Sequence, residues 1–118
     1  MKINKLTSSV LSFALFLAGA HTLQADVRVT MSDALKAAVS KPSPDYSPVA
    51  RQMKVSGAVE VEATIAPDGT VENVKVLTGN PLLTSSAVKA VKNWKFTPFT
   101  VDGEPSRAVA LLKFNFKP

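Results

Sequence analysis

The sequence predicts an α+β fold, a two-layer sandwich in which two helices cover one face of a three-stranded antiparallel sheet of order 2-1-3. Residues 57–66 alternate between apolar and polar side chains, which is the period of a half-buried strand, and residues 106–117 are expected to form a last long strand with its side chains in two rows. Between them, apolar residues from Leu83 to Trp94 recur at the spacing of one helical stripe. With 118 residues, the chain has room for one domain at most.

Residues 1–25 predict a secretory signal peptide. Lys2 and Lys5 form a basic start, an apolar run over 10–20 follows, and small residues mark two cut sites. We expect the cut after Ala25, with Ala20 as the alternative. The apolar run is about half as long as a membrane-spanning helix, so an uncleaved anchor is the weaker alternative. Loss of the two lysines would lower the net charge of the exported chain from +5 to +3.

Residues 26–43 form a short N-terminal extension before the expected domain, residues 44–118. Ser32 can cap two helical turns that reach Val39, and the prolines that follow end any helix. A helix this short is marginal by itself, so we expect the extension to be mobile or loosely docked.

A second short helix is expected over residues 48–54. Ser47 would cap it, and Pro48 would take the first helical position. Val49 and Met53 are four residues apart and would share its inner face.

Residues 57–66 and 70–77 predict a β-hairpin around the turn residues 67–69. In the first strand, Val59, Val61, Ala63 and Ile65 face one way. In the second strand, Val71 has the opposite parity to Val74 and Val76. A β-bulge near residues 72–73 would bring all three onto one face.

The helix after the hairpin carries the apolar stripe Leu83, Ala87, Ala90, Val91 and Trp94, and we expect Thr84 or Ser85 to cap it. A turn over residues 101–105 leads to the last strand, residues 106–117. Because the helix returns the chain across the sheet, the last strand fits beside the first strand in antiparallel orientation. Both the second and the last strand would then be edges.

Composition excludes most catalytic sites. The chain has no cysteine, and its one histidine, His21, lies at the signal boundary, so a nucleophilic triad lacks its base. The acidic residues lie in turns or on the outer face of a strand, which predicts no metal site and no cofactor. The lysines are scattered over the expected helix and strands rather than clustered, which argues against nucleic-acid binding. We therefore expect a non-enzymatic binding protein.

The chain resembles the TonB C-terminal domain family from about Pro44 to its end. The matching residues are Tyr46, Ala50-Arg51, Gly57, Pro67–Val71, Leu83, Ala87, Ala90-Val91, Trp94–Pro98, Gly103–Pro105 and Phe114. The most specific part is the W-x-F-x-P run that closes the helix, followed by G-x-P and a terminal strand. The chain departs from the family pattern at Ser47, where a proline is usual, and at Ser43, where TonB has a receptor-contacting glutamine.

The resemblance implies a periplasmic domain that binds extended segments of outer-membrane receptors by strand addition, as part of energy-coupled transport. Carried over by position, the partner-binding residues are Arg107, Val109, Leu111, Lys113 and Asn115 on the last strand, with Ser43 just before the domain and Tyr46 near its start. The edge could instead be protected by its charged residues. The alternative function is a stand-alone envelope scaffold, or a domain that forms homodimers through the same edge.

Overall fold

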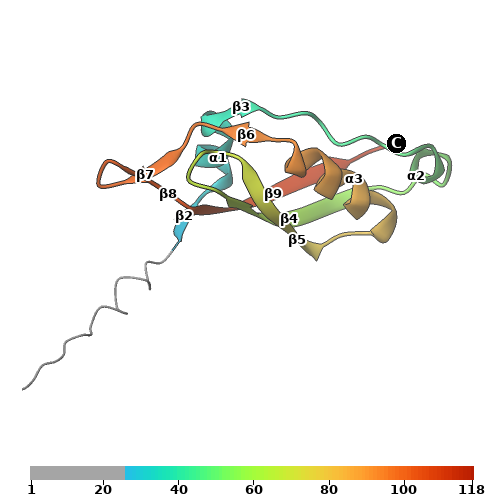
Figure 1. Ribbon diagram of the computed structural model, residues 1–118. Coiled ribbons are helices and arrows are strands. Elements are labelled where there is room, and N and C mark those ends of the chain that lie inside the picture. The colour runs from blue at the N-terminus through green and yellow to red at the C-terminus, as the bar shows by residue number, and fades with distance from the viewer. Residues whose placement is uncertain (1–25) are drawn as a thin grey trace, which may run out of the picture.

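A four-stranded sheet of order β2-β9-β4-β5 forms the base of the molecule (Figure 1). The computed structural model describes residues 26–118, so the predicted signal peptide, with both candidate cut sites, and His21 lie outside the described residues. β4 (Gly57–Ile65) pairs antiparallel with β5 (Val71–Thr78) and with β9 (Ala108–Phe116). The expected α+β class is confirmed, and the expected order 2-1-3 is present as β5-β4-β9.

A fourth strand, β2 (Val27–Val29), lies beyond β9 and pairs with it in parallel. The three-stranded sheet expected from the sequence does not include it. Three residues next to the signal boundary are too few to establish an alternation, so nothing local distinguishes them from a loop.

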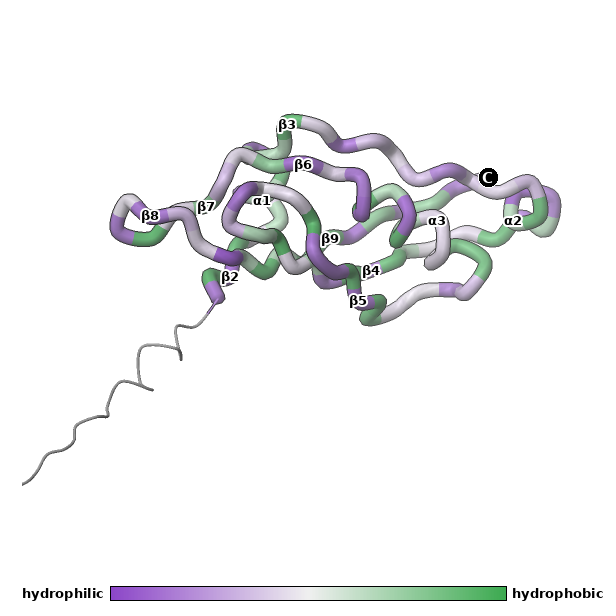
Figure 2. Tube along the Cα trace, viewed as in Figure 1, coloured by the Kyte–Doolittle hydropathy of each residue, from purple (hydrophilic) through white to green (hydrophobic). Residues whose placement is uncertain are grey.

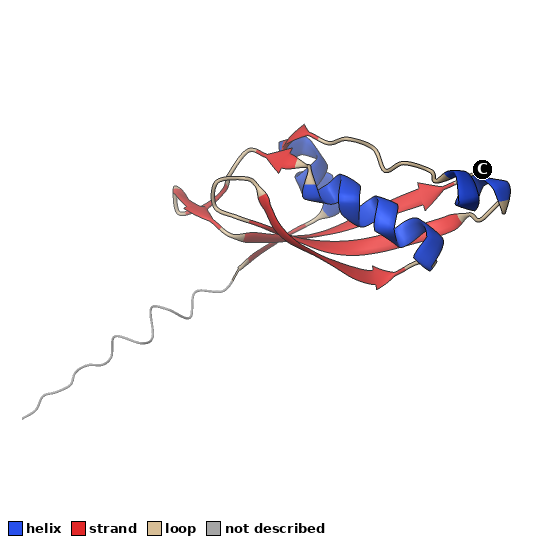
Figure 3. Ribbon diagram, turned by 45° about the vertical axis from the view of Figure 1, so that its right-hand side comes forward, coloured by secondary structure: helices blue, strands red, loops and turns tan. Residues whose placement is uncertain are grey.

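Within residues 26–118, three helices lie on one face of the sheet: α1 (Met31–Ala37), α2 (Pro48–Gln52) and α3 (Pro81–Lys92) (Figure 3). Two short strand pairs complete the fold. β3 (Ala38–Ser40) pairs with β6 (Lys95–Phe96), and β7 (Phe99–Val101) forms a hairpin with β8 (Glu104–Ser106). Asp102 and Gly103 both have positive φ, as a two-residue type I′ hairpin turn requires.

The core lies between the sheet and the helices. Apolar segments run along β4 and β9 (Figure 2), and over most of their length the inward side chains of these strands are fully buried. From β4 and β9 these are Val59, Val61, Ala63, Ile65, Ala108, Ala110 and Leu112. Trp94 and Phe96 pack against this cluster as rings 6.0 Å apart. With no disulfide in the chain, this apolar burial is the main source of stability.

The hairpin contains the bulge that the sequence predicts. Ile65 pairs with Val71, but the preceding residue Thr64 pairs with Asn73. Glu72 is therefore the extra residue in β5, which lets Val71 and Val74 face the core together.

α3 begins earlier than expected. Asn80, rather than Thr84 or Ser85, caps the helix, and its side-chain oxygen accepts a hydrogen bond of 2.8 Å from the Leu82 N–H. Pro81 takes the first helical position, where its missing N–H costs nothing. The predicted apolar stripe is confirmed, because Leu83, Ala87, Ala90 and Val91 are the buried residues of this helix.

The segment before the expected domain is docked, so the prediction of a mobile or loosely docked extension is wrong. Thr30 caps α1 in place of Ser32, accepting a 3.1 Å hydrogen bond from the Asp33 N–H. Ala34 is completely buried in the core, and the Ala37 carbonyl accepts a bond from the Thr97 N–H. Tertiary packing gives this short helix the stability that it lacks alone.

α2 begins as predicted, with Ser47 as its cap and Pro48 at the first position. Its apolar pair does not face inward, however. Val49 is 55% exposed and Met53 is 64% exposed, whereas Ala50 is completely buried. The helix has only five residues and contacts the core through Ala50.

Candidate functional site

The backbone of β9 has one side that β4 does not use. In a strand, the N–H and C=O of a residue point to the same side, and successive residues alternate. The Val27 N–H donates to the Arg107 carbonyl, at 3.0 Å. Odd-numbered residues of β9 therefore direct their N–H and C=O away from β4, toward β2.

β2 covers only the beginning of this side. Its three residues are in register with residues 108–110 of β9. Beyond Ala110, no strand among residues 26–118 pairs with β9 on that side. Residues 111–116, which we call the open edge, therefore present unpaired backbone groups at Lys113 and Asn115.

The sequence predicts that β9 lies at the border of the sheet along its whole length, and this is corrected for its first part. Val109 lies opposite Arg28 in the register, and the Arg107 carbonyl already accepts a bond from β2. Of the predicted row, only Leu111, Lys113 and Asn115 belong to the open edge.

A groove of about 510 Å³ lies where β2 ends beside β9. It is lined by Arg28, Val29, Thr30, Met31, Glu60, Val109, Leu111 and Lys113. This edge groove thus brings together three members of the predicted row, Val109, Leu111 and Lys113. Leu111 is 46% exposed, so an apolar side chain of a partner could be buried against it.

Charged residues surround the apolar part of the edge groove. Lys113 lies opposite Glu60 in β4, and Leu111 lies opposite Glu62. The Arg28 guanidinium is 3.7 Å from the Glu62 carboxylate, but the Arg28 side chain is 77% exposed. An ion pair this exposed contributes little to stability.

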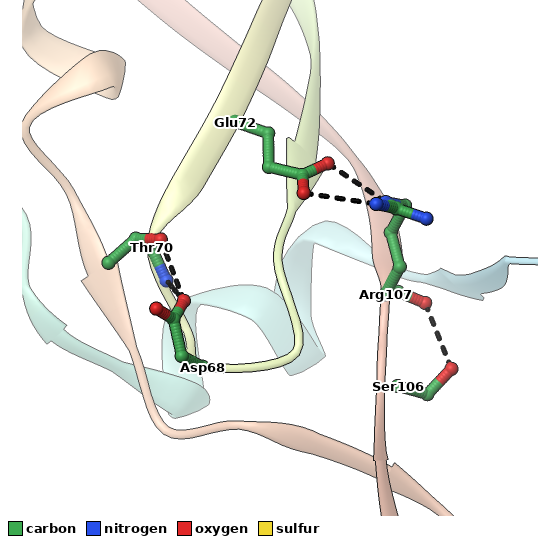
Figure 4. A network of polar contacts seen from close by, with 5 residues as sticks. All are labelled: Asp68, Thr70, Glu72, Ser106 and Arg107. Atoms are coloured by element: carbon green, nitrogen blue, oxygen red, sulfur yellow. Dashed lines mark hydrogen bonds and ion pairs between the residues drawn. The ribbon is translucent and has the colours of Figure 1, made fainter.

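Arg107, predicted as a partner contact, is engaged within the molecule (Figure 4). Its Nε and Nη2 donate to the two carboxylate oxygens of Glu72, at 2.8 and 3.1 Å. This bond raises the pKa of Arg107 and lowers the pKa of Glu72. The pair joins the bulge of β5 to the start of β9, so the Arg107 side chain makes its contacts within the sheet.

Figure 4 also shows the polar contacts of the hairpin turn. The Thr70 N–H and hydroxyl donate to Asp68 Oδ1, at 3.0 and 2.7 Å. These two bonds lower the pKa of Asp68. The Asp68 carboxylate is thus used within its own turn, as is usual for aspartate there.

Tyr46 supports the far end of β9. Its ring lies edge-on to Phe116, with centroids 6.1 Å apart, and its hydroxyl donates to the Val55 carbonyl. The Arg51 guanidinium lies 5.0 Å from the centroid of the Tyr46 ring, within the range of a cation–π contact.

Ser43 is not part of the edge groove. It lines a second groove, of about 490 Å³, between residues 42–48 and α3. The neighbouring carbonyl of Pro42 accepts a 2.9 Å bond from the Trp94 indole N–H, which fixes this segment against the end of α3. Nothing in the arrangement brings Ser43 together with Leu111 or Lys113.

Two other kinds of site are absent from residues 26–118. No group of three or more His, Cys, Asp or Glu side chains is placed to hold a metal ion. No helix in this part of the chain is long and apolar enough to cross a membrane.

The comparison with protein families decides the assignment. The profile described as "Gram-negative bacterial TonB protein C-terminal" matches residues 42–118. The chain belongs to the TonB C-terminal family. The resemblance noted in the sequence is thereby confirmed.

Individual relatives agree with the family. The chain is 29% identical over 83 residues to Protein TonB of Escherichia coli, a match that covers 66% of this chain and 33% of the relative. It is 34% identical over 76 residues to Protein TonB of Vibrio cholerae, covering 63% and 31%. The chain therefore spans about a third of the length of these relatives.

A solved structure shows the same fold. The solution NMR structure of the Pseudomonas aeruginosa TonB CTD superposes with a TM-score of 0.59 and 26% identity. The superposition covers 69% of this chain and 84% of that one. The TonB-like domain therefore makes up most of the described structure.

Proposed function

We propose that this chain is a periplasmic TonB-like adaptor. It binds extended segments of outer-membrane receptors, or of other envelope proteins, by adding them as a strand to the open edge of β9, and it is linked to TonB-type energy transduction. The observation that carries this proposal is the pair of residues Lys113 and Asn115, whose backbone groups are unpaired on the open edge beside the edge groove.

Strand addition fits the geometry of this edge. The free N–H and C=O groups of Lys113 and Asn115 would bond to the backbone of a guest segment, whatever its sequence. Side chains on the outer face of the guest would meet Leu111 and Lys113, which supply an apolar contact and a positive charge. Backbone bonds would thus give affinity, and these two side chains would give selectivity.

The proposal includes export. Removal of residues 1–25 would release the domain into the periplasm with no enzymatic role, no cofactor and no membrane span. His21 would leave with the signal peptide. N-terminal sequencing of the native protein tests this part, because a mature chain that still begins at Met1 contradicts it.

A proline substitution at Lys113 tests strand addition. The Lys113 N–H points away from β4, so Lys113→Pro removes a donor from the open edge without breaking a bond to β4. Val76→Pro is the matched control, because the β4–β5 register places the Val76 N–H on the free side of β5. Both variants should fold.

The measurement is a titration of isotope-labelled protein with a synthetic peptide copying the periplasmic N-terminal segment of an outer-membrane receptor. We expect amide shifts at residues 111–116 in the wild type and in Val76→Pro, and a loss of affinity of at least about tenfold in Lys113→Pro. Equal binding by the two proline variants contradicts the proposal. Absence of shifts, together with a concentration-dependent dimer, supports the alternative of self-association.

A further inference from the structure

β2 occupies the same side of β9 on which the proposed guest would lie. It pairs with residues 108–110, and the open edge begins at the next residue. We propose that β2 is a displaceable covering strand, which shields the first part of the binding edge in the free protein and leaves when a guest pairs with the full length of β9. This inference rests on the proposed function and concerns the regulation of the same site.

The contacts of β2 with the sheet are few. The strand has three residues, and its two valines are only partly buried against the core. Its one ion pair, between Arg28 and Glu62, is long and exposed. Short elements with little buried apolar surface are the ones that open locally without global unfolding.

The segment that follows β2 is attached much more firmly. Thr30 caps α1, and Ala34 of that helix is completely buried. β2 can therefore separate from β9 at Thr30 while α1 stays in place. Opening would cost the pairing of three residues and the partial burial of Val27 and Val29, while the completely buried core residues would stay in place.

Opening would enlarge the binding edge. A guest limited to the open edge has register positions from 111 to 116, whereas a guest that replaces β2 gains positions 108–110 as well. The edge groove already joins the two parts, because Val29 and Val109 line it together with Leu111. Displacement of β2 thus extends the site continuously.

Hydrogen exchange on the full chain tests the opening. The Val29 amide shares the parity of Val27 and points at β9, whereas the Leu112 amide points at β4. We expect the Val29 amide to exchange at least about tenfold faster than the Leu112 amide. Equal protection of the two amides overturns the proposal.

Two proline variants distinguish the loss of a hydrogen bond between β2 and β9 from the mere presence of a proline in β2. Val27→Pro removes the donor that bonds to the Arg107 carbonyl, at 3.0 Å in the wild type. Arg28→Pro is the matched control, because the N–H of Arg28 points away from β9. Val27→Pro should accelerate exchange at Val29 and Val109 further, and Arg28→Pro should leave both amides near their wild-type rates.

A binding experiment uses a free peptide of sequence DVRVT, which copies residues 26–30. At millimolar concentration it should shift the amides of residues 108–110 in Val27→Pro but not in the wild type. Arg28 and Val109 are register partners, so the substitutions Arg28→Cys and Val109→Cys allow a disulfide that joins β2 to β9. In the Val27→Pro chain this disulfide should abolish the response to the peptide, and reduction of the disulfide should restore it. A response of equal size in the wild type and in Val27→Pro would refute the covering role.

The two proposals can fail separately. If DVRVT binds as expected but the receptor peptide never shifts residues 111–116, the adaptor function fails and the displaceable strand stands. If the receptor peptide binds equally to the disulfide-locked chain and to its reduced form, the adaptor function stands and displacement of β2 is refuted.

Discussion

Among the glycines of residues 26–118, Gly69 leaves the least room for a side chain. It lies in the hairpin turn with φ of +93°, and a Cβ built there would be 2.0 Å from the Phe96 carbonyl oxygen. That carbonyl cannot move freely, because the Phe96 N–H donates to the Gly69 carbonyl at 2.9 Å. The turn and β6 therefore approach so closely that only glycine fits.

We predict that Gly69→Ala lowers the free energy of unfolding by at least about 3 kcal/mol, because backbone strain and a steric clash add. Gly103→Ala is the control. Gly103 also has positive φ, +81°, but no atom lies within 4 Å of the place that a Cβ would take. It should cost only about 1–2 kcal/mol, the strain alone. Urea unfolding measures both, and equal losses would contradict a role for the clash.

The Glu72–Arg107 pair predicts a pH dependence of stability. The pKa of Glu72 in the folded chain lies below its ordinary value of 4.5, chiefly because Arg107 bonds to the carboxylate. The resulting stabilisation is complete above the unfolded pKa and is lost as the pH falls through the folded pKa.

Thermal unfolding of the wild type should therefore shift to lower temperature as the pH falls from about 6 to about 3. Glu72→Gln should show a smaller shift, and Asp68, whose pKa is also lowered, accounts for the part that remains. Parallel pH profiles for the two proteins would show that the ion pair makes no contribution.

Glu72 and Arg107 show which local features can be predicted from the sequence and which cannot. The bulge at Glu72 is predictable, because the parity of Val71 conflicts with that of Val74 over a few residues. The engagement of Arg107 is not, because its partner lies 35 residues away. A positive charge on a predicted edge strand then resembles a free contact residue.

Among elements, long strands and short strands differ in what their sequences reveal. β4 and β9 have nine residues each. Alternation identifies the buried face along β4, and in β9 it does so from Leu112 to Phe116. β2 and β3 have three residues each and β6 has two. Pairing with a distant strand, rather than local pattern, makes these segments extended.

Helix boundaries show the same limit. The stripe from Leu83 to Trp94 identifies α3, but Pro81 can be read either as the end of the preceding strand or as the first helical residue. In α2 the spacing of Val49 and Met53 suggests a buried face, whereas the smaller Ala50 makes the contact. Spacing identifies a helix, and only packing identifies the face that it buries.

The difference between local pattern and tertiary pairing decides how much of the candidate site can be predicted from the sequence. The row Leu111, Lys113 and Asn115 follows from the alternation of β9 and from the resemblance to the family. The extent of the open edge does not, because it is set by β2. The edge groove likewise combines Met31 and Val29 with Lys113, residues far apart in the sequence.

For the whole molecule, the family segment and the stable unit need not coincide. The family profile begins at residue 42, but β2, α1 and β3 lie before it and contact the core. Ala34 is completely buried, and Met31 and Leu35 are partly buried against the same cluster. Removing these residues would expose apolar surface on β9 and β6.

We predict that a chain of residues 42–118 is less stable than one of residues 26–118 by at least about 3 kcal/mol, from the apolar contacts of α1. A chain of residues 30–118, which lacks β2 but keeps the Thr30 cap of α1, should lose much less, because β2 buries little. Urea unfolding of the three chains gives the comparison. If residues 42–118 unfold at the same urea concentration as residues 26–118, α1 is dispensable and the family segment is the folding unit. If residues 30–118 lose as much as residues 42–118, β2 is an integral strand rather than a displaceable one.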